Sequence, residues 1–339
     1  MTEPDSEFAA PEGPIADTRP SKRPDTVTAA SWMLLVVAIV SAVVLGLFAV
    51  RAIRDLLHER YSVYALRLPP DAVVNLLWML GLLTVSILAI PLIRRGHRGI
   101  RLLTLAYLGG SALKVAHDAI YAVARLPFGH SSANPSSRVD LAGTGLQALA
   151  VAFLVATIGL LVGPTASGWF HRSDRPRWSS SSTSPRRPGS ATAAWFLSVV
   201  ILLTNGGFEV WWAIRRVQHI PSYRPQALGL IAPALVSSGI ILLIFAVACV
   251  LLLFGNDIAR YCAVAFGGYF VFFGVLNLVT LLDVAVKYHI TLTFAGVLIC
   301  LVYTALGVLG AIAAVLLSRP AAAHWFHSRR FPTPEGAAT

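Results

Sequence analysis

Three ionisable residues lie close together in one long apolar stretch of the sequence. Lys114 and Asp118 are four residues apart, and His117 lies between them. Side chains at this spacing share one face of a helix, so the lysine and the aspartate are expected to pair. An imidazole beside a carboxylate can bind or pass on protons near neutral pH. The spacing therefore predicts a small polar site on one helix.

Further ionisable residues stand near the ends of two other apolar stretches. Glu209 precedes Arg215, and Asp283 and Lys287 repeat the four-residue spacing. Ionisable groups inside apolar spans are costly and mark candidate functional sites. One interpretation is an outward-facing polar cavity that binds a small ligand or relays protons. The other is that these groups reach the membrane surface, or pair so that they are tolerated in lipid. The candidate polar cluster comprises Lys114, His117, Asp118, Glu209, Asp283 and Lys287.

The amino-acid composition indicates whether water or lipid surrounds these residues. Hydrophobic residues make up 56% of the 339 positions, charged residues only 13%, and the mean hydropathy is +0.70. A soluble domain carries about 25% charged residues. The chain is therefore not an ordinary soluble enzyme, a disordered regulator or a fibrous protein. Most of it must lie in a membrane. Its apolar residues run continuously without alternation, which indicates helices.

Eight apolar stretches are long enough to cross a bilayer, which takes ~20 residues per helix. They lie at 26–50, 72–93, about 102–123, within 141–170, about 192–213, within 225–256, at 261–282 and within 288–318. The sequence thus predicts an all-α, polytopic membrane protein with eight transmembrane helices.

Four sequence matches recur in the same order in the two halves of the chain. Residues 23–30 recur at 187–194, 52–54 at 213–215, 96–109 at 255–268, and 164–171 at 320–327. A unit of four helices is even, so both copies enter the membrane in the same direction. The prediction is two parallel four-helix repeats, related by a pseudo-two-fold axis along the membrane normal.

The matches also divide the chain into segments. The prediction is a disordered cytoplasmic tail at 1–25, a first four-helix repeat at 26–172, a Ser/Pro/Arg-rich cytoplasmic linker at 173–189, a second four-helix repeat at 190–328 and a short cytoplasmic tail at 329–339. The first segment is rich in acidic residues and proline, which is typical of disorder. Serine and proline make the linker flexible.

The repeated motifs resemble a known kind of sequence. Arg-Pro-x-Thr-Val-Thr-Ala-Ala opens the first span at 23–30, and Trp-Phe-His closes each half at 169–171 and 325–327. Together with the excess of arginine over lysine, these motifs resemble uncharacterised multi-pass integral membrane proteins of actinobacterial type. The resemblance implies a location in a membrane, and it implies no activity.

The net charge of +11 fits a membrane topology without a nucleic-acid partner. Lysine and arginine hold short loops on the cytoplasmic side. With a cytoplasmic amino terminus, 16 of the 27 basic residues fall on that side. The prediction is a bacterial plasma (inner) membrane protein with both termini cytoplasmic. Aromatic residues near the inner ends of the spans are expected to anchor them at the membrane interface. These interface anchors are Trp32, Trp169, Phe170, Trp195, Trp325 and Phe326.

Paired small residues interrupt three of the spans. They are Gly109-Gly110, Gly267-Gly268 and the triplet at 205–207. Such pairs mark either unwound helices that bind a substrate or close contacts between helices. The second interpretation is favoured here.

The sequence contains no phosphate loop, no Gly-x-Ser-x-Gly and no His-Glu-x-x-His, and no catalytic, cofactor or metal site is predicted. Cys249, Cys262 and Cys300 lack paired spacing and are expected to be small buried hydrophobes. The predicted function is a non-catalytic scaffold or accessory membrane subunit that contacts the lipid bilayer and either a membrane-protein partner or a second copy of the chain. The alternative is a small-molecule or ion transporter, or a ligand-binding membrane protein, that uses the polar cluster in the outer half of the third, fifth and seventh helices.

Overall fold

The computed structural model describes residues 24–58, 70–125, 150–163, 165–166, 169–170, 187–218, 225–288 and 294–330. Within these ranges the chain is helical. The helices are α1 (Asp25–His58), α2 (Pro70–Arg94), α3 (Arg98–Arg125), α6 (Gly189–Gln218), α7 (Pro225–Leu253), α8 (Asp257–Tyr288), α9 (Phe294–Ser318) and α10 (Pro320–Arg330). A shorter apolar helix, Ala150–Val162, lies between α3 and α6 in the sequence. The tail at 1–23 and most of the predicted linker lie outside the described residues.

Among the described residues, six helices are long and apolar enough to cross a membrane. The spans are Asp25–Leu47, Val73–Arg94, Gly189–Arg215, Ile231–Leu253, Asp257–Asp283 and Gly296–Ser318. Two of the eight predicted spans are not among them. Arg101, Lys114 and Asp118 make α3 too polar, and the described part of the fourth, Ala150–Val162, is shorter than the ~20 residues that a span needs. The structure is consistent with a multi-pass helical membrane protein, and the number eight stays a prediction.

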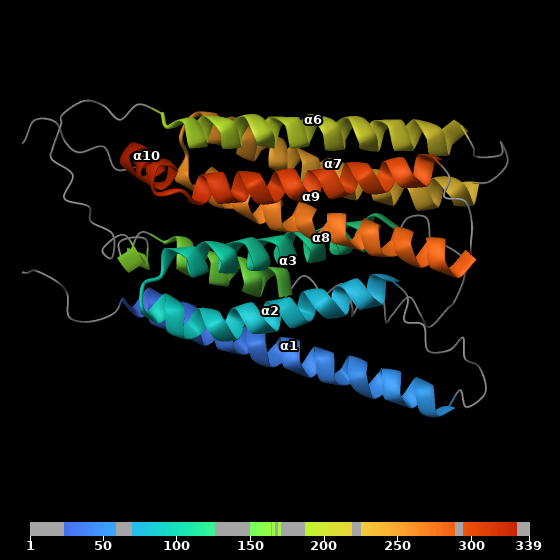
Figure 1. The fold of residues 1–339 in the computed structure, drawn as a ribbon, viewed down its shortest axis with the longest axis horizontal. Helices are drawn as coiled ribbons and strands as arrows, with labels where there is room; N and C mark the ends of the chain where they lie inside the picture. Colours follow the sequence, from blue (N-terminus) through green and yellow to red (C-terminus); the bar gives the residue numbers. More distant parts are fainter. Residues whose placement is uncertain are drawn as a thin grey trace, which may run out of the picture.

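The helices form a layered bundle with α3 and α8 in its middle (Figure 1). Helices α1 and α2 lie on the α3 side, whereas α6, α7 and α9 lie on the α8 side. α10 crosses one end of the bundle, and the starts of α1, α3 and α6 lie at that same end. The contacts between α3 and α8, between α3 and α7 and between α2 and α8 therefore join the first half of the chain to the second.

Glycine lets α3 and α8 approach closely. A side chain added at Gly109 would collide with Ala265, and one added at Gly268 would collide with the backbone of Ala106. A Cβ at Gly110 would lie 2.9 Å from the carbonyl carbon of Gly268. Both helices are continuous at these positions. The packing interpretation of Gly109-Gly110 and Gly267-Gly268 is therefore confirmed.

Helices α2 and α7 end in turns of the same construction. Gly96 follows α2 with φ 81°, and Gly255 follows α7 with φ 78°. In both turns the glycine N–H donates to the carbonyl three residues earlier, at 3.0 and 3.1 Å. The next N–H donates to the carbonyl five residues earlier, at 3.0 and 3.1 Å. Glycine adopts this left-handed conformation without the steric cost of a side chain. Each turn reverses the chain into the next helix, α3 or α8.

The starts of α1 and α6 are also built alike. The carbonyl of Pro24 accepts hydrogen bonds from the N–H groups three and four residues later, at 3.0 and 3.2 Å. The carbonyl of Pro188 accepts the same two bonds at 3.0 and 3.2 Å. Proline lacks a backbone N–H. At the start of a helix this costs no hydrogen bond, because the first N–H groups have no partner within the helix.

Candidate functional site

The predicted pair on α3 forms. Lys114 Nζ donates to Asp118 Oδ2 at 2.6 Å, and the two side chains are 21% and 38% exposed. The ammonium group also lies 5.6 Å from the ring centroid of Phe272 on α8, which is within cation–π range. The lysine is therefore shared between its own helix and the neighbouring one.

His117 joins α3 to α7 and α8. Its Nε2 lies 3.0 Å from Ser237 Oγ on α7, and Ser237 Oγ also donates to the carbonyl of Ala234 at 3.0 Å. A hydroxyl has one proton, so His117 Nε2–H is the donor to Ser237. The imidazole packs edge-on against the rings of Tyr269 and Phe273, and its Nδ1 is buried without a hydrogen-bond partner. This network places a proton on Nε2 of His117.

Glu209 lies on α6 and contacts a different helix. The hydroxyl of Tyr303 on α9 donates to Glu209 Oε1 at 3.2 Å. Phe208 packs edge-on against the same tyrosine, with ring centroids 5.4 Å apart. Sequence reasoning missed Tyr303, because it lies 94 residues from Glu209 and carries no local signal. Its position inside an apolar stretch is the only hint that its hydroxyl needs a partner.

The two remaining members of the candidate polar cluster lie near the end of α8. Asp283 is half-buried, and the side chain of Lys287 lies outside the described side chains. The predicted pairing of Asp283 with Lys287 therefore stays a prediction.

The cluster is thus distributed over several helix contacts. Lys114 and Asp118 face α8, His117 bonds to α7, and Glu209 bonds to α9. The polar residues of α3 and Glu209 of α6 come nearest to each other at Tyr269 on α8. This tyrosine packs against His117 and interacts electrostatically with Glu209 and Asp118. Each of these three contacts holds two helices together.

Buried charges also lie at the opposite end of α3 and α8, where sequence analysis placed Arg101 and Arg260 among the cytoplasmic charges. They are 5% and 4% exposed. Arg101 Nη2 donates to the hydroxyl of Tyr261 at 2.9 Å. Arg260 donates to Asp257 at 3.2 Å and to the carbonyl of Leu317 at 3.0 Å. The sequence located these charges by topology, which does not reveal that the protein interior surrounds them.

Three of the six predicted interface anchors are buried in protein. Phe170, Trp325 and Phe326 are 0%, 4% and 0% exposed. Phe170 lies in the core of the first half of the chain, whereas Trp325 and Phe326 are on α10, which packs against its neighbours. Trp32 is 59% exposed on α1. Trp195 is half-buried, and its Nε1 donates to the carbonyl of Cys249 at 3.1 Å. Trp169 packs against the core of the first half of the chain.

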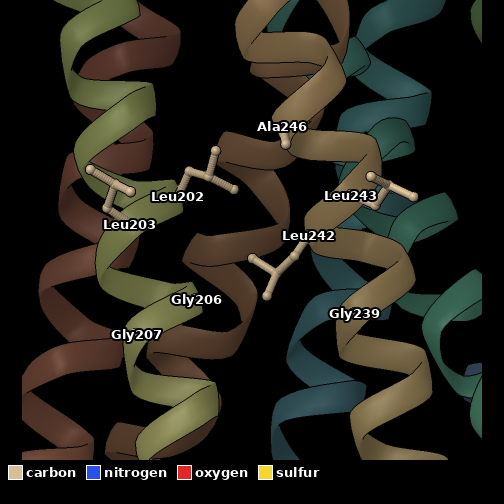
Figure 2. Close-up of a pocket in the computed structure, with 8 residues that line it drawn as sticks. All are labelled: Leu202, Leu203, Gly206, Gly207, Gly239, Leu242, Leu243 and Ala246. Atoms are coloured by element: carbon tan, nitrogen blue, oxygen red, sulfur yellow. The ribbon is translucent and has the colours of Figure 1, made fainter.

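A cleft of about 440 Å³ lies between α6 and α7. Figure 2 shows Leu202 of α6 and Leu242 of α7 pointing toward each other, whereas Leu203 and Leu243 point away from the space between the two helices. The cleft is lined by Leu202, Leu203, Gly206, Gly207, Gly239, Leu242, Leu243 and Ala246, and by none of the candidate polar cluster. A Cβ added at any of the three glycines would meet nothing within 4 Å. The packing interpretation therefore fails for Gly206-Gly207 among the described residues.

The donor groups of the described residues do not form a metal centre, since no three His, Cys, Asp or Glu side chains among them gather closely enough to hold an ion. Cys249 and Cys300 are buried free thiols, and Cys262 is a half-buried one. The described site is therefore a set of polar contacts between helices, beside an apolar cleft. This combination is consistent with a multi-pass helical membrane protein.

Comparison with known proteins finds no match to a family model, a curated protein or a solved structure. The resemblance carried by the Arg-Pro-x-Thr-Val-Thr-Ala-Ala motif stays a prediction.

Proposed function

We propose that the protein is a non-catalytic integral protein of the bacterial inner membrane, where it acts as a scaffold or accessory subunit. The cleft between α6 and α7 carries this proposal. Helices associate in membranes where small residues let their backbones approach, because lipid provides no hydrophobic driving force between them. Gly206, Gly207 and Gly239 offer such a surface, with open space where side chains would stand. A transmembrane helix of a partner is the occupant that fits this chemistry.

Four glycines of α3 and α8 make a contrast. Gly109, Gly110, Gly267 and Gly268 are each in close contact with a neighbouring helix of the same chain. Their lack of a side chain is explained by the fold itself. Gly46 and Gly99 are equally open, but Gly206, Gly207 and Gly239 come from two helices and line one cleft, which supports a contact with another molecule.

The polar residues support a structural role over transport. A transporter would gather the candidate polar cluster around a cavity open to water. Instead, Lys114 pairs within α3 and lies over the ring of Phe272 on α8, while His117 and Glu209 form hydrogen bonds to α7 and α9. These contacts hold helices together.

We also propose that the chain forms eight spans in two parallel four-helix repeats, with both termini cytoplasmic. The equivalent turns at Gly96 and Gly255 and the equivalent helix starts at Pro24 and Pro188 support it, because all four lie at positions matched in the sequence. Reporter fusions test the topology. Green fluorescent protein fused after residue 339 should fluoresce, and alkaline phosphatase inserted at 126–149 should be active. An active phosphatase at the carboxyl terminus would contradict the arrangement.

Site-specific photocrosslinking tests the scaffold function. A photoreactive amino acid replaces Leu203 or Leu243, which are 68% and 65% exposed beside the cleft, and Val43 on α1, 55% exposed, serves as the control. In native membranes we expect a discrete polypeptide adduct from the two cleft positions and lipid adducts from position 43. Gly239→Leu should abolish the adduct without lowering the thermal stability of the purified protein. Lipid adducts alone at all three positions would overturn the proposal, and an adduct with a second copy would identify a homo-oligomer.

A further inference from the structure

The carboxyl groups inside the described helices differ in their counter-charges. Asp118 pairs with Lys114 at 2.6 Å, and Asp257 pairs with Arg260 at 3.2 Å. Glu209 forms no ion pair with any described residue, and its bond is to the neutral hydroxyl of Tyr303 at 3.2 Å. It is therefore a carboxyl group without a compensating cation in this part of the molecule.

Because of the position of Glu209, the lack of a compensating cation is unfavourable for its ionised form. It lies within the span Gly189–Arg215, six residues from the end of the span, or ~9 Å at 1.5 Å per residue. An ionised carboxylate within an apolar span is unfavourable unless a counter-charge or water offsets it. Binding of a proton neutralises the Glu209 carboxylate.

Among the described side chains, the groups that face Glu209 do not supply a positive charge. Tyr303 approaches from α9, and Tyr269 on α8 interacts with it electrostatically. The residues of α7 that line the cleft are apolar, and α10 packs against the other end of α6. On α6 itself, Arg215 is exposed and lies over the ring of Trp211 at 5.7 Å.

We propose that Glu209 and Tyr303 form a proton-binding site within the membrane, in which the Glu209 carboxyl is neutral near pH 7. The tyrosine hydroxyl donates to one oxygen, and the other oxygen holds the bound proton. The ligand is a proton because one carboxyl and one hydroxyl are too few for metal ions such as Ca²⁺, which take six or more oxygen ligands. The site is independent of the partner helix proposed above.

Proton binding at this position couples to the contact between α6 and α9. In the neutral form, the Glu209–Tyr303 hydrogen bond joins two uncharged groups within an apolar contact. Loss of the proton places a negative charge there, with the tyrosine hydroxyl as its hydrogen-bond donor. The charge state of one residue thus bears on the packing of α6, the helix that forms one wall of the cleft.

Infrared spectroscopy of the full-length protein in lipid vesicles tests the site. At about pH 7 water-exposed carboxyl groups are ionised, so a C=O stretch from a protonated carboxyl reports a shielded group. We expect such a band in the wild type, its loss in Glu209→Gln and its retention in Asp118→Asn. Tyr303→Phe should shift the band, because it removes a hydrogen bond to the carbonyl oxygen. An identical carboxyl region in the wild type and Glu209→Gln would overturn the proposal.

A second measurement does not depend on the folding of any variant. Dicyclohexylcarbodiimide reacts from the lipid phase with protonated carboxyl groups, and mass spectrometry locates the adduct on the wild-type chain. Modification should fall on Glu209, decrease as the pH is raised, and spare Asp118, which has Lys114 as its ion-pair partner at 2.6 Å. The absence of an adduct on Glu209, or one whose yield is the same at every pH, would count against proton binding.

Discussion

Arg101 on α3 and Tyr261 on α8 are joined by a hydrogen bond of 2.9 Å across 160 residues of sequence. The guanidinium of Arg101 lies 5.2 Å from the ring centroid of Tyr261 and 4.8 Å from that of Phe170, and that of Arg260 lies 5.1 Å from Tyr261. Two buried cations thus share one tyrosine ring. Cation–π attraction and the hydroxyl together offset the cost of burying these charges. The contact ties the two halves of the chain together at the end where α10 lies.

Tyr261→Phe should destabilise the protein. The substitution keeps the ring beneath both guanidinium groups but removes the hydroxyl that accepts from Arg101. A hydrogen bond to a charged group contributes about 1.5–3 kcal/mol, so the free energy of unfolding should fall by that amount in detergent–SDS mixtures followed by circular dichroism. Tyr107→Phe is the matched control, because Tyr107 stacks on Trp78 and its hydroxyl has no hydrogen-bond partner among the described residues. Equal losses in the two variants would show that the hydroxyl of Tyr261 is unimportant.

Gly268→Ala should disrupt the contact between α3 and α8. The new methyl group would meet the carbonyl oxygen of Ala106, a backbone atom that cannot rotate away. Overpacking typically costs about 1–3 kcal/mol, so the melting temperature should drop and the gel-filtration peak should broaden. Gly46→Ala on α1 makes the same chemical change where no atom lies within 4 Å, and it should neither lower the melting temperature nor broaden the peak. Wild-type behaviour of Gly268→Ala would show that the two helices do not approach this closely.

Local spacing predicted the parts of the site that lie within one helix. Lys114 and Asp118 pair as the four-residue interval requires, because the geometry of a helix alone sets their separation. The glycine pairs of α3 and α8 likewise predicted close packing, since a small residue in a span has few other uses.

The contacts between helices could not be predicted in this way. The approach of Tyr303 to Glu209 depends on how α6 and α9 are rotated, and the apolar pattern of a membrane helix says little about rotation because lipid and core are both apolar. The burial of Arg101 was missed for a related reason: counting charges assigns a side of the membrane, whereas burial depends on the tertiary contacts with Tyr261 and Phe170.

The turns at Gly96 and Gly255 should each be sensitive to alanine. Both glycines have positive φ, at 81° and 78°, where a side chain costs about 1–2 kcal/mol. Each single Gly→Ala variant should lose about that much unfolding free energy, and each Gly→Asn variant should lose less, because asparagine tolerates this conformation. Gly99→Ala is the control, since Gly99 lies within α3 with nothing in reach of a Cβ. Similar losses at Gly96 and Gly255 would show that the two turns are energetically equivalent, and no loss at either would contradict the left-handed geometry.

The pair on α3 should show coupling in a double-mutant cycle. Lys114→Met leaves the carboxylate of Asp118 against an apolar helix face without its cation, and Asp118→Asn leaves the ammonium group with the ring of Phe272 alone. Because Asp118 is 38% exposed, solvent screens part of the interaction, and a coupling on the order of 1 kcal/mol is expected. The double variant should therefore be more stable than the sum of the single losses predicts, whereas strict additivity would show that the 2.6 Å contact contributes nothing to stability.

Glu209→Gln, by contrast, replaces a carboxyl that has no paired cation among the described residues, and the unfolding free energy of this variant should stay close to that of the wild type.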